Sequence, residues 1–289
     1  MRLGLSHPTL DDDTFQAVAD LAYKESGIRL VPEKRLMVQS RLRHRLRALR
    51  LSTFSEYTEH VLSEAGTDER RFMISALTTN VSQFFREAQH FDILTNRLLP
   101  EFRARIASGK RIRIWSAGCS NGQEPYSIAM HMLRHEPMLA SADFRILGTD
   151  IDPAVIARAR NGTYTAAQVA DVSEEDRARF MMADPDQSDS FQIVDALKSI
   201  VSFQELNLFS EWPMRFAFDA IFCRNVVIYF DLVTQERLWP RFRNALAPSG
   251  LLFLGHSERV LTPAMHGLKS VGPTAYFKSE ISTSVLASV

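Results

Sequence analysis

The sequence has few cysteines, no long apolar run and no excess of charge of either sign. Its 289 residues include only two cysteines, Cys119 and Cys223, which lie far apart and each within an apolar stretch. Two such cysteines form neither a disulfide framework nor a zinc site, and they indicate a reducing compartment. No apolar run approaches the ~18 residues that a membrane-spanning helix needs. Because 34 Lys and Arg residues balance 34 Asp and Glu residues, the composition does not favour a protein that coats nucleic acid or an anionic membrane.

The remaining composition is that of a folded protein. Hydrophobic residues make up 45% of the chain and charged residues 24%, and the length allows one large domain or two. The first residues turn acidic at Asp11 and contain no apolar h-region, so we expect no signal peptide and a cytoplasmic location.

The first 80 or so residues read as helices. Phe15, Val18 and Leu21 recur at the spacing of one helical face, after an acidic start typical of a helix N-terminus. The patterns predict helices over residues 11–25, 33–50, 55–63, 67–77 and 85–107. We therefore predict an N-terminal all-helical domain.

From residue 111 onward, short apolar strands alternate with helices. Strands are predicted over residues 111–115, 144–147, 200–203, 219–223 and 251–254, and the clearest helices over residues 153–160 and 231–246. This alternation is typical of an α/β domain with a mainly parallel sheet covered on both faces.

Two stretches depart from the alternation. The runs 268–271 and 275–278 predict a terminal antiparallel hairpin. Residues 183–206 contain two β-like runs around a polar turn, which predicts a small antiparallel β-subdomain that runs into the third core strand. This subdomain is either decoration or a docking surface.

Two glycines follow the first predicted strand, in the segment RIRIWSAGCSNGQEPYSIAM. Gly118 and Gly122 permit a tight turn and a close approach of a ligand to the backbone. Their spacing is not that of a dinucleotide fingerprint, and no lysine follows them as in a phosphate-binding P-loop. The alternatives are an ordinary glycine-containing turn and a site for a nucleoside-bearing cofactor without a phosphate chain.

Polar residues follow several of the other strands. Asp150 and Asp152 follow the second strand, where a carboxylate can accept hydrogen bonds from ribose hydroxyls. Asp152 precedes Pro153 and suits a helix N-cap, so Asp150 is the better ribose candidate. Arg224 and Asn225 follow the apolar run AIFC, where open α/β sheets bind ligands. A snorkelling arginine and a helix-capping asparagine are the structural alternatives for this pair.

One segment breaks the charge balance, because residues 34–50 contain seven Lys and Arg residues and no acidic residue. An apolar stripe runs along this helix and consists of Val38, Leu42, Leu46 and Leu49. Arg41 and Arg45 flank the stripe on one side, and Arg43 and Arg47 flank it on the other. The segment is either a solvated basic face or a docking surface for an acidic partner helix. A nucleic-acid partner is not favoured, because aromatic residues are not interleaved with the arginines.

Six stretches together resemble the CheR-type protein-glutamate O-methyltransferases, which methylate chemotaxis receptors. The stretches are TTNVSQFFREAQHF, IRIWSAGCSNGQEPYSIAM, GTDIDPAVIARARNGTY, NLF, FDAIFCRNVVIYFD and GLLFLGHSE. They occur in the family's order, and the resemblance covers roughly residues 12–280. It implies a Rossmann-like S-adenosylmethionine-dependent domain over residues 96–289 that carries the 183–206 β-subdomain. It also implies a receptor-recognition domain over residues 1–78 and a linker over residues 79–95 that contributes to the active site.

The resemblance also implies the cofactor, S-adenosylmethionine, whose product is S-adenosylhomocysteine. The family's cofactor-binding positions correspond to Asn80, Ser82, Arg86, Glu124, Asp150, Asn207, Leu208, Arg224 and Asn225. By the same resemblance Asp150 binds the ribose, and Arg86 and Tyr229 are the catalytic residues, with Tyr229 near the methyl group. Three residues depart mildly from the commonest pattern, namely Ser82 and Asn121, where threonine is usual, and Gln123, where glutamate is usual.

The implied chemistry suits these residues. A glutamate side chain, with a pKa near 4.3, is already an anionic nucleophile at cytosolic pH, so no general base is needed. No metal is required either. The resemblance implies that Arg41, Arg43, Arg45 and Arg47 bind the substrate, which is a cytoplasmic helix of a chemoreceptor. We expect a monomer that neither binds nucleic acid nor inserts into the membrane. The rival functions are methylation of RNA or a small molecule, and a catalytically silent cofactor-binding module.

Overall fold

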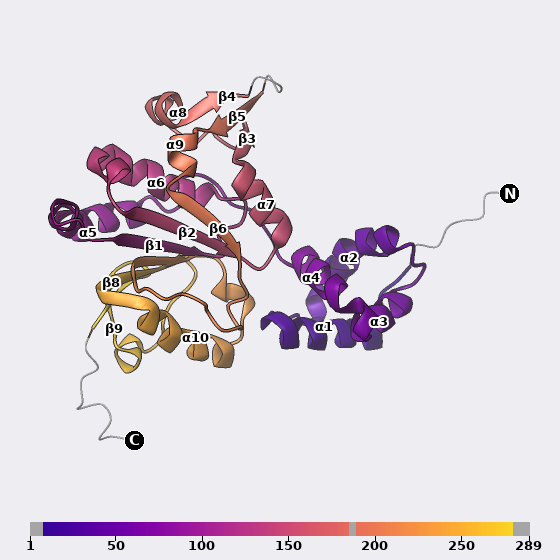
Figure 1. Cartoon of the computed structure of the whole chain (residues 1–289). Coiled ribbons are helices and arrows are strands. Elements are labelled where there is room, and N and C mark those ends of the chain that lie inside the picture. The colour runs from indigo at the N-terminus through magenta and orange to yellow at the C-terminus, as the bar shows by residue number, and fades with distance from the viewer. Residues whose placement is uncertain (1–7, 185–188, 280–289) are drawn as a thin grey trace. The chain divides into compact units, whose positions relative to one another are not determined.

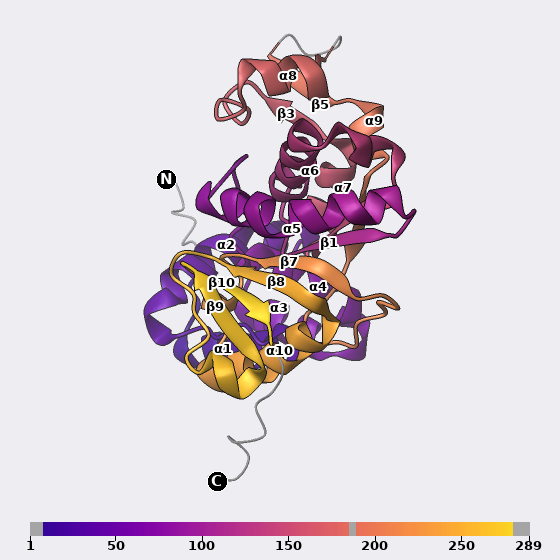
Figure 2. The same cartoon turned by 90° about the vertical axis from the view of Figure 1, so that its left-hand side faces the viewer.

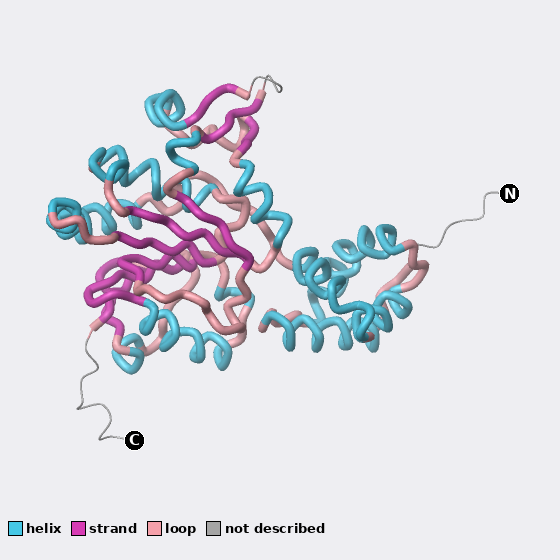
Figure 3. Tube along the Cα trace, in the orientation of Figure 1, coloured by secondary structure: helices cyan, strands magenta, loops and turns pink. Residues whose placement is uncertain are grey.

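The computed structural model describes residues 8–184 and 189–279. Its internal contacts divide the chain into two units (Figure 1). The first unit comprises residues 1–79 together with Tyr229–Asp231, and the second comprises residues 80–228 and 232–289. Among the described residues, every strand lies in the second unit (Figure 3).

The first unit is built from four helices that bury one face each. They are α1 (Asp12–Ser26), α2 (Arg35–Leu49), α3 (Phe54–Leu62) and α4 (Thr67–Leu77). Helix α1 begins where the Asp11 side chain accepts a hydrogen bond from the Thr14 N–H at 2.8 Å, and it ends at Gly27 with a φ of 69°. The apolar stripe of α2 packs inward, since Val38, Leu42 and Leu46 are buried. These four helices confirm the predicted all-helical domain.

The arginines of α2 differ in their surroundings. Arg45 makes a bidentate contact with the buried carboxylate of Glu69, at 2.8 and 2.5 Å, and the Tyr57 hydroxyl donates to the same carboxylate at 3.0 Å. Arg41 donates to the carbonyl oxygens of Leu77 and Thr78 at 2.6 and 3.0 Å, so it caps the end of α4. Both side chains therefore hold α2 against α4.

Arg43 and Arg47 are placed differently from these two arginines. Neither forms an ion pair with a carboxylate among residues 8–184 and 189–279. Arg47 is exposed and Arg43 is half-buried. Of these four arginines, only Arg45 pairs with a carboxylate in the described part of the chain, and Arg43 and Arg47 are not held by the polar contacts that fix Arg41 and Arg45.

The second unit contains a seven-stranded sheet in the order β6-β2-β1-β7-β8-β10-β9. The strands are β1 (Ile112–Ala117), β2 (Phe144–Asp150), β6 (Val201–Glu205), β7 (Phe218–Cys223), β8 (Leu246–Leu254), β9 (Leu268–Gly272) and β10 (Ala275–Lys278). The first five strands in the sheet order pair in parallel, and β10 pairs antiparallel with both β8 and β9. This arrangement confirms the predicted mainly parallel sheet with a terminal antiparallel hairpin.

Helices cover both faces of this sheet. Helices α5 (Gln89–Ala107), α6 (Gln123–His135) and α7 (Pro153–Asn161) lie on one face, and α10 (Leu232–Ala245) lies on the other (Figures 1 and 2). The core between them consists of side chains such as Phe102, Ile114, Ile146, Phe222 and Phe253. Because the parallel strands end at one edge of the sheet, the loops that follow them meet there.

A second, three-stranded antiparallel sheet stands apart from the large one (Figure 1). Its strands are β3 (Thr163–Thr165), β4 (Met181–Ala183) and β5 (Ser190–Ile193), with α8 (Glu174–Phe180) and α9 (Asp195–Lys198) beside them. The predicted small antiparallel β-subdomain is present, but it begins before the predicted 183–206 stretch. Strand β3 lies wholly before this stretch, and β4 overlaps it only at Ala183. A strand as short as β3 leaves no readable alternation in the sequence.

One predicted helix begins later than expected. Residues 85–107 were expected to be helical, whereas α5 begins at Gln89. Phe85 and Glu87 adopt φ values of 53° and 57°, which no right-handed helix contains. The FFRE segment is therefore a loop, and the 79–95 linker of the sequence prediction includes the first turns of α5.

No helix in the described part of the chain is long and apolar enough to cross a membrane. Helix α3, for example, buries one face, on which Phe54, Tyr57 and Val61 lie.

The Arg45–Glu69 contact generates a prediction about stability. Replacing Arg45 by alanine leaves the buried Glu69 carboxylate without its bidentate partner, and we expect a loss of about 2–3 kcal/mol in unfolding free energy. Arg47→Ala is the matched control on the same helix, and it should change stability by less than about 0.5 kcal/mol. Urea unfolding followed by circular dichroism measures both. Equal unfolding midpoints for the two variants would contradict the structural role of Arg45.

Candidate active site

The loop that precedes α5 carries the FFRE segment. Phe84 is buried, and the Phe85 N–H donates to the Ser127 hydroxyl of α6 at 2.9 Å. The Arg86 carbonyl oxygen accepts a hydrogen bond from Arg224. The Arg86 guanidinium has no hydrogen-bond or ion-pair partner among the described residues. A half-buried guanidinium without a protein partner is suited to bind an external carboxylate.

The glycine loop after β1 lies close to the neighbouring backbone. The N–H groups of Gly118 and Cys119 donate to the Thr149 carbonyl oxygen of β2 at 2.7 and 2.9 Å. Gly118 has a φ of 85°, and a Cβ atom at this position would lie 2.3 Å from a methyl carbon of Val226. The turn therefore requires glycine here, as the sequence predicted for a tight turn.

Asp150 ends strand β2 with a buried carboxylate. Its two oxygens accept hydrogen bonds from the Ser120 N–H at 2.9 Å and from the Asp152 N–H at 3.0 Å. Burial raises the pKa of Asp150 to about 6, and the two backbone hydrogen bonds act in the opposite direction. The carboxylate thus faces the glycine loop with further lone pairs available.

Asp152 fulfils the capping role that its sequence position indicated. One of its oxygens accepts a hydrogen bond from the Ala154 N–H at 2.8 Å at the start of α7. The other oxygen accepts from the Asn80 side chain at 2.8 Å. The Asn80 carbonyl oxygen in turn accepts from the Ser120 hydroxyl at 3.0 Å. Asn80 is therefore fixed against the loops that follow β1 and β2.

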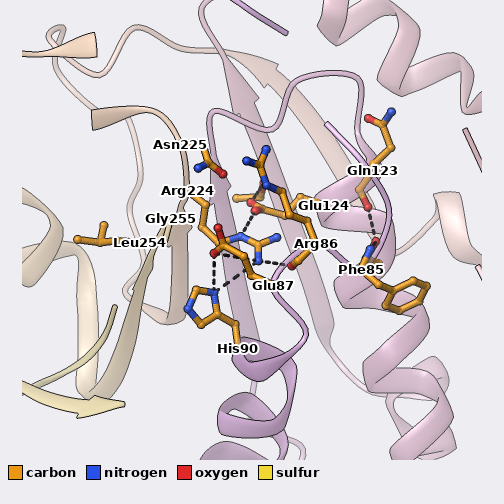
Figure 4. Close-up of polar contacts among 12 residues, drawn as sticks. Phe85, Arg86, Glu87, His90, Gln123, Glu124, Arg224, Asn225, Leu254 and Gly255 are labelled. Carbon is orange, nitrogen blue, oxygen red and sulfur yellow. Dashed lines mark hydrogen bonds and ion pairs between the residues drawn. The ribbon is translucent and has the colours of Figure 1, made fainter. Parts of the chain in front are cut away.

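Arg224 and Glu124 form a buried ion pair between β7 and α6 (Figure 4). The Arg224 Nε atom lies 2.6 Å from one Glu124 oxygen, and the Ser116 hydroxyl donates to the other oxygen at 2.6 Å. The Glu87 carboxylate lies 3.7 Å from Arg224 on its other side. The snorkelling alternative for Arg224 is wrong, because its side chain is 3% exposed.

His90 is fully buried, and its Nδ1 atom lies 3.4 Å from the Arg224 guanidinium. Its pKa is lowered, first by burial and then by the positive charge of Arg224, while Glu87 opposes the shift. The lowered pKa favours the neutral form of the ring, which then acts as a hydrogen-bonding group. It contacts the Thr274 hydroxyl at 3.1 Å.

The remaining predicted residues occupy the loops after β6 and β7. Asn225 has a φ of 59°, and its N–H donates to the Glu258 carboxylate at 2.8 Å. The Asn207 side chain accepts a hydrogen bond from the Phe209 N–H at 2.9 Å, and the Leu208 carbonyl oxygen accepts from the Trp212 indole at 3.2 Å.

The structure thus brings most of the predicted residues to one edge of the large sheet. Strands β6, β2, β1 and β7 are neighbours in that order. Asp150 ends β2, and Asn207, Leu208, Arg224 and Asn225 follow β6 and β7. Hydrogen bonds connect Asn80, Ser82, Arg86 and Glu124 to residues that follow β1 and β7. Tyr229 belongs by its contacts to the helical unit, where its carbonyl oxygen accepts the Arg29 N–H at 2.9 Å.

Sequence reasoning missed three residues that hold this edge together. Glu87, His90 and Glu258 contact the backbone or side chains of the predicted residues. Glu87 and Glu258 belong to the FFRE and GHSE motifs, but no pattern within one segment shows what a side chain contacts in another. The described residues contain no cluster of His, Cys, Asp and Glu that could hold a metal ion.

Comparison with known proteins identifies the family. The model of the CheR methyltransferase SAM-binding domain matches residues 80–276, and the model of the CheR all-alpha domain matches residues 13–78. A probable chemotaxis protein methyltransferase of Rhizobium etli is 47% identical over 257 residues, which cover 89% of this chain and 96% of the relative.

Two further relatives carry similar names. Chemotaxis protein methyltransferase 2 of Pseudomonas aeruginosa is 39% identical over 93% of this chain and 94% of its own. The chemotaxis protein methyltransferase of Escherichia coli is 39% identical over 86% of this chain and 85% of its own. With both domain models matched over nearly the whole chain, the protein belongs to the CheR family of S-adenosylmethionine-dependent methyltransferases.

Proposed function

We propose that this chain transfers a methyl group from S-adenosylmethionine to glutamate side chains of chemotaxis receptors, which gives glutamyl methyl esters. One observation carries the proposal, besides family membership. The Arg86 guanidinium, which has no partner among the described residues, and the buried Asp150 carboxylate belong to loops at the same edge of a methyltransferase sheet. A cation for the methionine carboxylate and an anion for the ribose hydroxyls are the two groups that this cofactor needs.

The residues around these two groups also fit the cofactor. Asp150 would accept hydrogen bonds from the ribose hydroxyls, and Asn207 and Leu208 on the next strand would lie beside the adenosine. Asn80, Ser82 and Arg86 would bind the methionine end, and the Gly118 turn permits the close backbone approach. Glu124, Arg224 and Asn225 would line the site. When bound, the cofactor supplies a methyl group that its positive sulfonium activates.

The chain's own contribution is placement of the reactants and exclusion of water. A substrate glutamate is ionised at cytosolic pH, so no residue has to remove a proton. We assign Tyr229 to orient the incoming carboxylate, together with Arg86. The half-buried Tyr229 has no side-chain hydrogen-bond partner within the described part of the chain, so its hydroxyl is available for a substrate.

The receptor segment would be a cytoplasmic helix that carries the substrate glutamates. On α2, the uncompensated charges of Arg43 and Arg47 fit such an acidic helix, whereas Arg41 and Arg45 would support the surface from within. A monomer in the cytoplasm suits this partner. The net charge of zero supports a receptor over RNA as the substrate.

The chemical nature of the product tests the function directly. The protein should transfer label from the tritiated methyl group of the cofactor to receptor cytoplasmic fragments. Treatment with alkali should then release the label as methanol, because carboxyl esters hydrolyse in base. Label that resists alkali, or label that goes to RNA in place of the receptor fragment, would show that the proposed reaction is wrong.

The ribose assignment predicts the behaviour of Asp150→Ala. Loss of charge-assisted hydrogen bonds should weaken S-adenosylhomocysteine binding by about 1–3 kcal/mol, a roughly 5- to 150-fold rise in Kd. Because the pKa of Asp150 is raised to about 6, wild-type affinity should also fall as pH drops below 6 and the carboxylate gains a proton.

Titration calorimetry measures both effects. The matched control is Asp143→Ala, which removes an exposed carboxylate before the other end of the same strand. It should bind the product like the wild type. A folded Asp150→Ala protein with unchanged affinity and an unchanged pH profile would mean that Asp150 does not contact the ribose.

The two sides of α2 should respond differently to mutation. Arg43→Ala combined with Arg47→Ala should raise the KM for the receptor and leave the Kd for the cofactor unchanged. The defect should shrink as salt rises, since exposed charges are screened over ~8–10 Å at physiological ionic strength. Arg41→Ala combined with Arg45→Ala should mainly lower stability. Steady-state kinetics at low and high salt distinguish the two, and a wild-type KM for the first pair would exclude the docking role.

A further inference from the structure

The segment Gly255–Glu258, which follows β8, contacts two loops of the active site. It carries the GHSE motif, to which the proposed function assigns no role. We infer that Glu258 is a positioning residue, which holds the Asn225 turn in its left-handed conformation while His256 anchors the FFRE loop. The inference rests on the cofactor-binding roles proposed for Arg86 and Asn225.

Glu258 is buried, with 3% of its surface exposed, and all its described hydrogen bonds are to backbone N–H groups. One carboxylate oxygen accepts from Asn225 at 2.8 Å and from Gly255 at 2.6 Å, and the other accepts from Ile228 at 3.1 Å. A carboxylate has about four lone-pair sites, so one side chain can satisfy several donors at once. Burial raises the pKa of Glu258, and these backbone bonds oppose the shift.

The turn that Glu258 holds has a left-handed backbone, which asparagine adopts more readily than other residues with a Cβ atom. Asn225 has a φ of 59°, a conformation that residues with a Cβ atom rarely adopt. Such residues persist only when the surrounding structure fixes them, and they concentrate at functional sites. The N–H groups of Asn225 and Ile228, which both donate to Glu258, lie at the two ends of the turn. Ile228 directly precedes Tyr229.

Gly255 allows Glu258 to reach the turn. A Cβ atom on Gly255 would lie 2.6 Å from the Asn225 side-chain nitrogen and 2.8 Å from the Asn225 backbone nitrogen. The end of β8 thus approaches the turn more closely than any other residue type permits. Gly255 and Glu258, the first and last residues of the GHSE motif, therefore both serve the contact with the Asn225 turn.

His256 connects the same segment to the second loop. Its backbone N–H donates to the Glu87 carboxylate at 3.0 Å, and its ring nitrogen lies 3.2 Å from the same oxygen. Glu87 also has a left-handed backbone, with a φ of 57°, and directly follows Arg86. One segment of four residues therefore secures the neighbours of both Arg86 and Tyr229.

The test replaces Glu258 by glutamine, which keeps the shape of the side chain. The amide nitrogen cannot accept hydrogen bonds, so it would face backbone donors and release the turn. We expect kcat to fall roughly 10- to 100-fold, as for small misplacements at a reaction centre. The Kd for S-adenosylhomocysteine should rise, and the receptor KM should stay unchanged. Hydrogen exchange at the Asn225 and Ile228 amides should become faster.

The matched control is Asp219→Asn. Asp219 is also buried and accepts a backbone N–H, from Arg113 at 2.8 Å, but it lies at the opposite end of strand β7. This variant should keep the wild-type kcat and Kd. If Glu258→Gln does not fold, Glu258→Asp retains the charge with one methylene fewer and should still lose kcat.

Four outcomes decide between the possibilities. A folded Glu258→Gln or Glu258→Asp protein with wild-type kcat and Kd overturns the inference. A lower melting temperature with unchanged kcat shows a merely structural role and overturns it too. Asn225→Ala is measured in parallel to separate the two proposals. If it keeps full cofactor affinity, the proposed site itself is wrong, whereas loss of affinity there with an intact Glu258→Gln protein rejects only the positioning role.

Discussion

Three segments of the site depend on the buried ion pair between Arg224 and Glu124. Two charges out of water are tolerated only when they are paired and their other polar atoms are also satisfied. The Ser116 hydroxyl satisfies the second Glu124 oxygen, and the Arg86 carbonyl oxygen accepts from the Arg224 guanidinium. The pair therefore fixes the end of β7, the first turn of α6 and the loop before α5 at the same time. That loop needs such a constraint, because Phe85 and Glu87 carry left-handed backbones that it would not keep alone.

The sequence predicted those features that depend on one segment at a time. Apolar periodicity located the four N-terminal helices to within about two residues at each end, and alternation located the parallel strands. Asp152 was expected to cap a helix, and it does so. The family motifs supplied the cofactor, and they supplied the residues that we propose for its site.

Features that depend on contacts between distant segments could not be predicted in this way. The helix expected from residue 85 begins at Gln89, because contacts with Ser127 and His256 stabilise a loop that helix-forming residues alone do not indicate. Arg45 was interpreted as part of a docking face, but its partner Glu69 lies 24 residues further along the chain. The apolar periodicity of one helix carries no information about the residues that it contacts in another helix. Glu258, 33 residues from Asn225, is the same kind of omission.

Two buried carboxylates of this part of the molecule, those of Asp150 and Glu258, hold the backbone of its loops. Buried groups with perturbed pKa values often mark a general acid or base. Here the pKa values of Asp150 and Glu258 are both raised by burial, yet both carboxylates are engaged by backbone N–H groups. A carboxylate held in this way is an orienting group. Orienting groups suit a reaction whose nucleophile is already ionised and whose methyl donor is already activated. In such a reaction the protein has only to place the two reactants.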